Sequence, residues 1–190
     1  MLKAIIFDMD GVLVDSNKYI WESFNAILNN DGIHLSDEHI KKYLGRSLRD
    51  QLTLWEKEYG YKKYSLEEFS KKAGKIQFEL MEKELGHNEA LDEFLKELKD
   101  DNIKMAVATS SARWRAEKIL EILKITEYFS VIVTSEDIAL HKPNPDIFLE
   151  AAKKLSENPE DCIVFEDAVN GIEAARNGGM KVVAIETEFQ

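Results

Sequence analysis

The stretch IIFDMDGVLVDS (residues 5–16) joins a short apolar run to three aspartates. The run KAIIF (3–7) lacks the alternation of a half-buried strand, which predicts a strand covered on both faces. Asp8 and Asp10 follow it at once. In an extended segment, side chains two positions apart point to the same side, so we expect both carboxylates to face one site while Met9 faces away. Like charges this close repel each other, and a counter-ion is therefore expected beside them.

Four further apolar runs rich in Val, Ile and Ala predict the rest of a sheet. They are IKMAVA (103–108), VIVT (131–134), CIVF (162–165) and KVVAI (181–185). Segments with helical spacing lie around them, at 90–101, 115–125, 145–155 and 171–179. This alternation predicts an α/β fold, a Rossmann-like, doubly wound parallel sheet with helices on both faces. Asn144 is the expected N-cap of the helix that follows the third strand, and Gly178 and Gly179 the expected stop of the next one.

Residues 16–87 contain no run of the β type. Helical spacing occurs instead at about 17–29, 36–44, 47–58 and 65–85. Ser65 and Glu68 have the spacing of a capping box at the start of the last of these helices. The sequence therefore predicts two domains: a Rossmann-like core formed by residues 1–15 and 88–190, and an all-helical cap formed by residues 16–87.

The composition is that of a globular protein, with 190 residues, 44% of them hydrophobic and 32% charged. A formal net charge of −11 argues against a nucleic-acid or anionic-membrane partner. Cys162 is the single cysteine, which excludes an intramolecular disulfide and fits a reducing compartment. We find neither a signal peptide nor an apolar run of membrane-spanning length, and we expect a cytoplasmic protein that is a monomer or weak dimer.

Unusual polar side chains follow nearly every predicted strand. They are Asp8 and Asp10 after the first strand, Thr109, Ser110 and Ser111 after the second, Lys142 after the third, and Glu166 and Asp167 after the fourth. Each has an ordinary explanation alone, since acids and hydroxyls cap helices and a lone lysine is usually solvated. Their coincidence at the carboxyl edge of one sheet predicts a ligand site.

The residue types at this edge indicate the ligand. Carboxylate oxygens in an incomplete shell suit Mg²⁺, which keeps waters and accepts substrate oxygens. The hydroxyl of Thr109 and the N–H groups of Ser110 and Ser111, at a helix start, form an expected anion-binding corner. With Lys142 as a second positive charge, the site predicts a phosphoryl group, and hence a small phosphorylated metabolite as substrate.

Four segments together resemble a known family: DMDGVLVDS, VATSS, HKPNPDIFLEAA and VFEDAVNGIEAA. In this order they are similar to the motifs of the haloacid dehalogenase superfamily. The branch is the one with a helical cap inserted after the first motif, to which phosphosugar phosphatases and β-phosphoglucomutase belong. The resemblance covers nearly the whole chain and implies a Mg²⁺-dependent phosphoryl-transfer enzyme.

The resemblance also implies a role for each matching residue. Asp8 is the implied nucleophile, which forms an aspartyl phosphate, and Asp10 the implied general acid and base. Thr109 and Lys142 would hold the phosphoryl oxygens. The implied ligands of Mg²⁺ are Asp8, the backbone carbonyl of Asp10, and Asp167, with Glu166 supporting the metal's waters.

Two arginines are candidates for binding the rest of the substrate. Arg46, in a turn between cap helices, could reach over the site, although a solvated turn residue is an equal alternative. Arg113, near Thr109, is a similar candidate. Trp21, Trp55 and Trp114 are expected to be packing residues.

The cap favours a phosphatase over the alternatives. Ile20 occupies the position on the first cap helix where the mutase has a histidine, so a gate that protects the phosphorylated aspartate from water is not expected. A phosphosugar mutase remains the alternative enzyme. A phosphate-binding module without catalysis is a third possibility, although such a protein would be expected to lack one of the four carboxylates. A dehalogenase has no task for Asp10.

Overall fold

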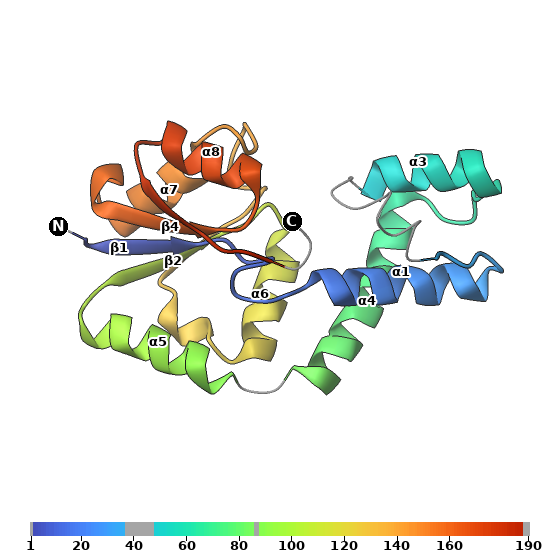
Figure 1. Ribbon diagram of the computed structural model, residues 1–190, viewed down its shortest axis with the longest axis horizontal. Helices are drawn as coiled ribbons and strands as arrows, with labels where there is room; N and C mark the ends of the chain where they lie inside the picture. Colours follow the sequence, from blue (N-terminus) through green and yellow to red (C-terminus); the bar gives the residue numbers. More distant parts are fainter. Residues whose placement is uncertain (1, 37–47, 86–87, 188–190) are drawn as a thin grey trace. The chain divides into compact units, whose positions relative to one another are not determined.

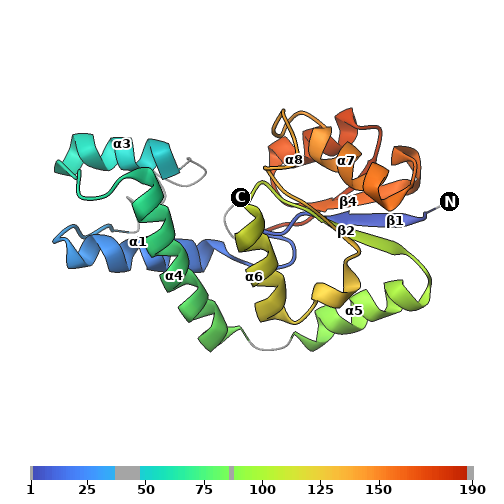
Figure 2. The same ribbon diagram turned by 180° about the vertical axis from the view of Figure 1, so that it is seen from behind.

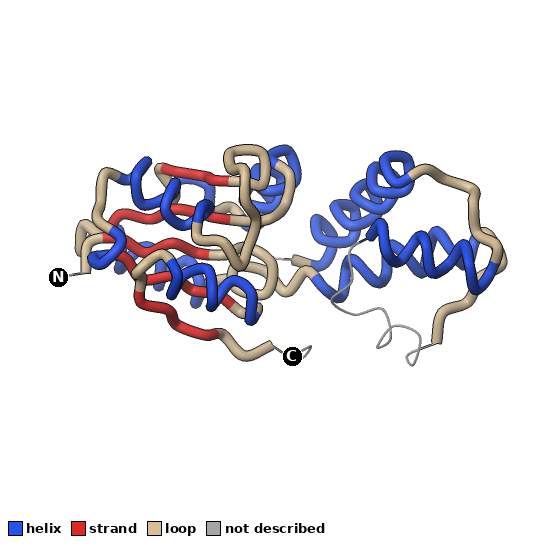
Figure 3. The backbone as a smooth tube through the Cα atoms, turned by 90° about the horizontal axis from the view of Figure 1, so that it is seen from above, coloured by secondary structure: helices blue, strands red, loops and turns tan. Residues whose placement is uncertain are grey.

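A computed structural model of the protein describes residues 2–36, 48–85 and 88–187. The chain divides into two compact units. One unit contains the chain up to Ser16 and again from Leu85 onward, and the other contains Asn17–Glu84. Figure 3 shows that the first unit holds the strands, whereas the second consists of helices and loops.

The first unit is built on a five-stranded parallel sheet with the order β3-β2-β1-β4-β5. The strands are β1 (Ala4–Phe7), β2 (Lys104–Ala108), β3 (Val131–Val133), β4 (Cys162–Glu166) and β5 (Lys181–Ala184). The helices of this unit are α5 (Glu89–Asp100), α6 (Arg113–Leu123), α7 (Asp146–Leu155) and α8 (Val169–Asn177). Helices α7 and α8 cover one face of the sheet, while α5 and α6 lie on the other (Figures 1 and 2). The predicted α/β doubly wound fold is confirmed.

Both faces of the central strand β1 are buried, which explains its unbroken apolar sequence. Ile6 belongs to the cluster that includes Phe148 of α7, on one face. Phe7 contacts aromatic rings instead, with ring centroids 5.2 Å from Phe165 and 6.4 Å from Phe94 of α5. In register, Ile6 lies opposite Ala106 of β2 on one side and Val164 of β4 on the other. This packing fixes the end of β1 at Phe7, and therefore the position of Asp8.

The helix ends follow the sequence signals except at α7. Gly178 is the C-cap of α8, and Gly179 has a φ of +75°, as expected for a helix stop. At α7 the predicted N-cap is wrong by one residue, because Pro145 and not Asn144 holds that position. The side chain of Asn144 instead donates a hydrogen bond to the His141 carbonyl at 3.1 Å, within the loop.

The second unit contains α1 (Asn17–Asn30), α3 (Leu48–Tyr59) and α4 (Leu66–Glu84). Trp55 and Phe69 are fully buried in its core, with Trp21 and Phe24 beside them. The predicted capping box is confirmed: the Ser65 N–H donates to the Glu68 carboxylate at 2.8 Å, and the Glu68 N–H donates to Ser65 Oγ at 3.3 Å. The helix expected at 36–44 falls almost entirely on residues 37–47, outside the described part of the chain.

Trp21 and Trp55 are packing residues, as predicted, but the prediction for Trp114 is wrong. Its side chain, at the start of α6, is 49% exposed. None of the helices within residues 2–36, 48–85 and 88–187 is long and apolar enough to cross a membrane.

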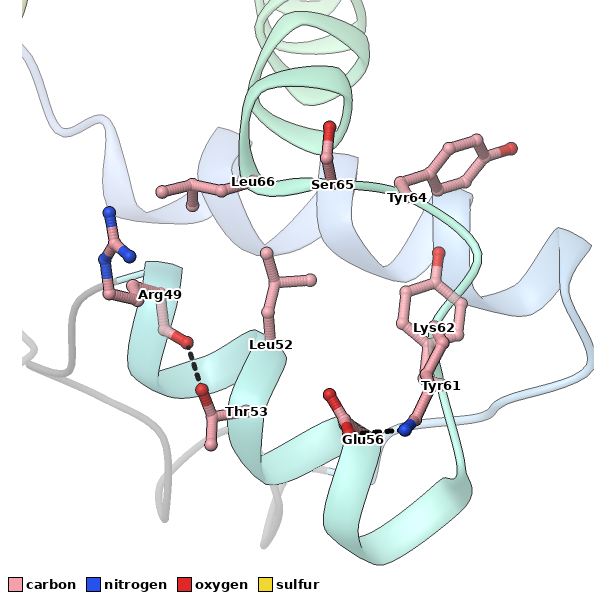
Figure 4. A pocket seen from close by; sticks show the side chains of 9 residues that line it. All are labelled: Arg49, Leu52, Thr53, Glu56, Tyr61, Lys62, Tyr64, Ser65 and Leu66. Atoms are coloured by element: carbon pink, nitrogen blue, oxygen red, sulfur yellow. Dashed lines mark hydrogen bonds and ion pairs between the residues drawn. The ribbon is translucent and has the colours of Figure 1, made fainter.

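The helical unit has a surface pocket of about 350 Å³ between α3 and the start of α4 (Figure 4). It is lined by Arg49, Leu52, Thr53, Glu56, Tyr61, Lys62, Tyr64, Ser65 and Leu66. The Lys62 amine is paired with Glu56 at 2.7 Å, and Thr53 Oγ1 donates to the Arg49 carbonyl at 2.9 Å. The pocket is therefore mixed in character, and much of its polar lining is already paired.

Candidate active site

Asp8 lies directly after β1, with its N–H hydrogen-bonded to the Phe165 carbonyl of β4 at 2.9 Å. Its side chain is buried, and the Lys142 ammonium donates to Asp8 Oδ1 at 2.5 Å and to Glu166 Oε2 at 2.9 Å. Burial raises the pKa of Asp8 to about 7, although the positive charge of Lys142 opposes this effect. Burial would lower the pKa of Lys142, but the charges of Asp8 and Glu166 outweigh it and raise that pKa. The geometry therefore holds a charged ammonium between two carboxylates.

Glu166, the last residue of β4, is 1% exposed and is fixed from two sides. Its Oε2 accepts the bond from Lys142, and its Oε1 accepts a hydrogen bond from the Ala168 N–H at 3.0 Å, at the N-cap of α8. Gly171 provides the space, because a Cβ atom there would lie 2.1 Å from Glu166 Cδ. The Glu166 carboxylate is therefore packed directly against the start of α8.

Asp8, Glu166 and Asp167 could together hold a metal ion, because each offers a carboxylate oxygen and these atoms lie within 4.8 Å of one another. Burial raises the pKa of Asp167, and the charge of Glu166 adds to this effect. The Asp167 carboxylate lies so close to Gly11 that a Cβ there would be 2.1 Å from Asp167 Oδ2. Mg²⁺ prefers hard oxygen ligands, and its charge would offset the repulsion among the three carboxylates. The residues therefore fit the predicted ion.

Asp10 has different partners from Asp8, although only Met9 separates them. The chain turns after Met9: Gly11 has a φ of +89°, and its N–H donates to the Val14 carbonyl at 2.8 Å. The Asp10 carboxylate accepts hydrogen bonds from Arg115, Ser16 and Ser111. Burial acts to raise the pKa of Asp10, but Arg115 and the two hydroxyl groups outweigh it and lower that pKa. Met9 is fully buried.

The segment after β2 places Thr109 and Ser111 at the same edge. Thr109 is buried, and its N–H extends the sheet to the Val133 carbonyl at 3.0 Å. The Ser111 N–H donates to Thr109 Oγ1 at 3.1 Å, and the Ser111 hydroxyl to Asp10 at 3.0 Å. The backbone donor expected at Ser111 is therefore already used, whereas Ser110 is exposed.

Comparison with known proteins assigns this geometry to a family. The sequence pattern of the haloacid dehalogenase-like hydrolases matches residues 5–185. The chain belongs to the haloacid dehalogenase-like hydrolases. It is 31% identical, over 95% of this chain and 83% of the relative, to a phosphorylated carbohydrates phosphatase from Thermotoga maritima. It is 32% identical, over 97% and 83%, to the β-phosphoglucomutase of Bacillus subtilis.

A solved structure agrees with the fold. The β-phosphoglucomutase of Clostridium difficile superposes with a TM-score of 0.75, at 26% identity, over 97% of this chain and 84% of that one. The predicted family and the prediction of a hydrolase of that family are confirmed. The two curated relatives named above are a phosphatase and a phosphoglucomutase, both enzymes of phosphorylated compounds.

Of the two arginines predicted to bind the substrate, the structure describes only Arg113. The Arg113 guanidinium donates to Asp137 at 2.5 Å and to the Ile132 carbonyl at 3.4 Å. Arg46 lies outside the described residues. For both, substrate binding stays a prediction.

Sequence reasoning about this haloacid dehalogenase-like hydrolase missed Arg115 and Ser16, the two residues that contact Asp10 from outside the predicted set. Arg115 has the appearance of a solvated charge on an amphipathic helix. One signal was available in the sequence. Arg115 comes four residues after Ser111, and side chains with this spacing are neighbours at the start of a helix.

Proposed function

We propose that this hydrolase is a Mg²⁺-dependent phosphatase that hydrolyses a small phosphomonoester through an aspartyl phosphate. One observation carries the proposal: the buried Asp8 carboxylate lies 2.5 Å from the Lys142 ammonium and within 4.8 Å of carboxylate oxygens of Glu166 and Asp167. A carboxylate nucleophile among other carboxylates repels an anionic phosphoryl group. It can attack that group only when positive charge, here Lys142 and a metal ion, is supplied beside it.

The first step transfers the phosphoryl group to Asp8. A carboxylate oxygen of Asp8 forms a bond to phosphorus while the bond from phosphorus to the leaving oxygen breaks. Asp10, which must enter this step protonated although its partners lower its pKa, gives its proton to that oxygen. In the second step water attacks the same phosphorus and gives a proton to Asp10. The bond between Asp8 and phosphorus breaks, and inorganic phosphate leaves.

Lys142 and Thr109 hold the phosphoryl oxygens in this scheme. The Lys142 ammonium already bonds Asp8 and Glu166, so it both orients the nucleophile and provides positive charge. Asp8, Asp167 and the backbone carbonyl of Asp10 would hold Mg²⁺, with Glu166 supporting its waters. When bound, the ion supplies positive charge that offsets the carboxylates and the developing charge on the phosphoryl oxygens.

The helical unit, Asn17–Glu84, would act as the cap that selects the substrate. A sugar phosphate is supported by the phosphatase for phosphorylated carbohydrates among the relatives. The acidic composition and the single cysteine support a cytoplasmic protein, and a monomer or weak dimer stays a prediction.

A phosphate-release screen tests this function. The purified protein is incubated with a panel of sugar phosphates, nucleotides and p-nitrophenyl phosphate, with Mg²⁺ and with excess chelator. We expect release from a subset of the esters that stops in chelator, and no release by Asp8→Asn. Equal release by Asp8→Asn would refute the role of Asp8, and full activity in chelator would refute the metal site.

A mutase is the second candidate, because the β-phosphoglucomutase of B. subtilis is as similar as the phosphatase. Ile20 cannot donate or accept a proton, and its side chain packs against the apolar cluster of the helical unit. A gate at this position is therefore not expected. The discriminating assay supplies a hexose 1-phosphate with a trace of the 1,6-bisphosphate, and formation of the 6-phosphate with little free phosphate would favour the mutase.

A further inference from the structure

Arg115 contacts the carboxylate of Asp10 at two points. Its Nη1 lies 2.9 Å from Asp10 Oδ2, and its Nη2 lies 3.0 Å from Asp10 Oδ1. The planar guanidinium matches the two oxygens of a carboxylate, so this arrangement restricts both the position and the rotation of the group. Arg115 lies on α6, more than a hundred residues from Asp10 in the sequence.

Two hydroxyl groups complete the contact. The Ser111 hydroxyl donates to Asp10 Oδ2 at 3.0 Å and accepts from Arg115 Nη1 at 2.6 Å. The Ser16 hydroxyl donates to Asp10 Oδ1 at 2.5 Å. Each oxygen of Asp10 thus accepts one hydrogen bond from the guanidinium and one from a serine. The carboxylate cannot turn without breaking at least two of these bonds.

The environment distinguishes this pair from ordinary surface ion pairs. The Arg115 side chain is 13% exposed and that of Asp10 is 31% exposed, whereas exposed pairs such as Lys71 and Glu67 have both side chains about three-quarters exposed. Partial burial and a two-point geometry are the conditions under which an ion pair holds its members in place.

The origin of α6 connects this contact to the reaction. The segment after β2 places the Thr109 hydroxyl at the sheet edge and then enters α6 at Arg113. Ser111, just before the helix, and Arg115, in its first turn, contact each other. The same segment therefore presents a group for the phosphoryl oxygens and fixes the carboxylate that must reach the leaving oxygen and the water.

We propose that Arg115 is a positioning residue for Asp10, and this inference rests on the proposed function. Arg115 forms no bond to the substrate and transfers no proton. It fixes the place from which Asp10 acts, and one of the four hydrogen bonds to the carboxylate must be exchanged for a bond to the reacting oxygen when the proton is transferred. Small displacements of such a group are costly to the chemical step.

The test compares variants in steady-state hydrolysis of p-nitrophenyl phosphate with saturating Mg²⁺. Arg115→Met removes the charge and keeps much of the apolar stem. We expect kcat to fall on the order of 10-fold to 10²-fold, with KM little changed, because the substrate is not touched. Arg115→Lys keeps the charge without the fork and should restore part of kcat. Arg176→Met, the same change on the exposed end of α8, is the matched control and should leave kcat unchanged.

A double-mutant cycle with Asp10→Asn separates positioning from a general structural effect. If Arg115 acts through Asp10, adding Arg115→Met to Asp10→Asn should change kcat by less than about 2-fold. The same fold loss in both backgrounds, or a normal kcat in Arg115→Met alone, would overturn the proposal.

Folding is checked for every variant by circular dichroism. Should Arg115→Met not fold, Ser111→Ala takes its place in the same cycle, because Ser111 contacts both partners. The proposed function fails separately, if Asp8→Asn still hydrolyses the ester. Parental activity that depends on Asp8, together with a normal Arg115→Met, would refute the role of Arg115 alone.

Discussion

Gly171→Ala tests whether the buried Glu166 carboxylate is held as the structure indicates. Gly171 is the third residue of α8, and inside a helix this change normally stabilises a protein by up to about 1 kcal/mol, because alanine loses less conformational freedom. Here the new Cβ would lie 2.1 Å from Glu166 Cδ and 2.2 Å from Oε1, so the side chain must move. We therefore expect the sign of the effect to be reversed.

The size of the loss follows from the contacts of Glu166. The displaced carboxylate would give up its bonds to the Lys142 ammonium and the Ala168 N–H, which are 2.9 Å and 3.0 Å long. Hydrogen bonds to charged groups are worth about 1.5–3 kcal/mol each. After the helix gain is subtracted, we expect a net loss of about 2–5 kcal/mol in the free energy of unfolding. Turnover should fall as well, since Lys142 loses one of its two fixed partners.

Urea denaturation followed by circular dichroism measures this change. Glu173→Ala, an exposed position on the same helix, is the matched control and should change the free energy of unfolding by less than about 0.5 kcal/mol. A Gly171→Ala protein as stable as the parent, or more stable, would refute the packing of Glu166 against α8.

Three further outcomes are expected. Asp10→Asn should lower kcat by about 10² to 10⁴-fold, as is usual for an acid–base group, and an unchanged rate would give Asp10 another role. Asp167→Ala should raise the Mg²⁺ concentration for half-maximal activity, measured by titration of the chelated enzyme, and an unaltered requirement would remove Asp167 from the metal site. Burial raises the pKa of Asp137, but bonds from Thr134, Lys154 and Arg113 outweigh it and lower the pKa to about 2, from 3.8. Asp137 should therefore stabilise the fold above pH 4 and lose that contribution as pH falls toward 2. The difference in unfolding free energy between parent and Asp137→Asn should shrink by about 1 kcal/mol in acid, a value reduced for partial exposure, and a constant difference would contradict this.

The sequence predicted the centre of the sheet well, because β1 is covered on both faces, and the edge strand β5 is largely exposed but keeps an apolar run. In β1, Ile6 meets the α7 side while Phe7 meets aromatic rings on the other, so no position is free to be polar. Local signals such as the box of Ser65 and Glu68 were also sufficient, since both partners lie within one helical turn.

The site was less predictable, because the hydrogen-bond partners of its carboxylates come from distant parts of the chain. The rule for extended segments predicted that Asp8 and Asp10 face one site. Their hydrogen-bond partners differ, Lys142 for Asp8 and Arg115 for Asp10, but the charge of Asp10 still acts to raise the pKa of Asp8. The contact of Asp10 with Arg115 joins distant parts of the chain, and the one local signal, the spacing of Arg115 from Ser111, does not point to Asp10. Residues 37–47, which include Arg46, are not described, so that part of the prediction was not tested.

The most direct test of the central claim is to trap the phosphorylated aspartate. The enzyme is mixed with a substrate from the screen, quenched in acid during turnover, reduced with borohydride, and analysed by peptide mass spectrometry. An acyl phosphate is reduced to an alcohol, so the account predicts homoserine at position 8, dependent on both substrate and Mg²⁺, and none in Asp8→Asn. Reduction at another aspartate, or an unmodified Asp8 in an enzyme trapped during turnover, would contradict it.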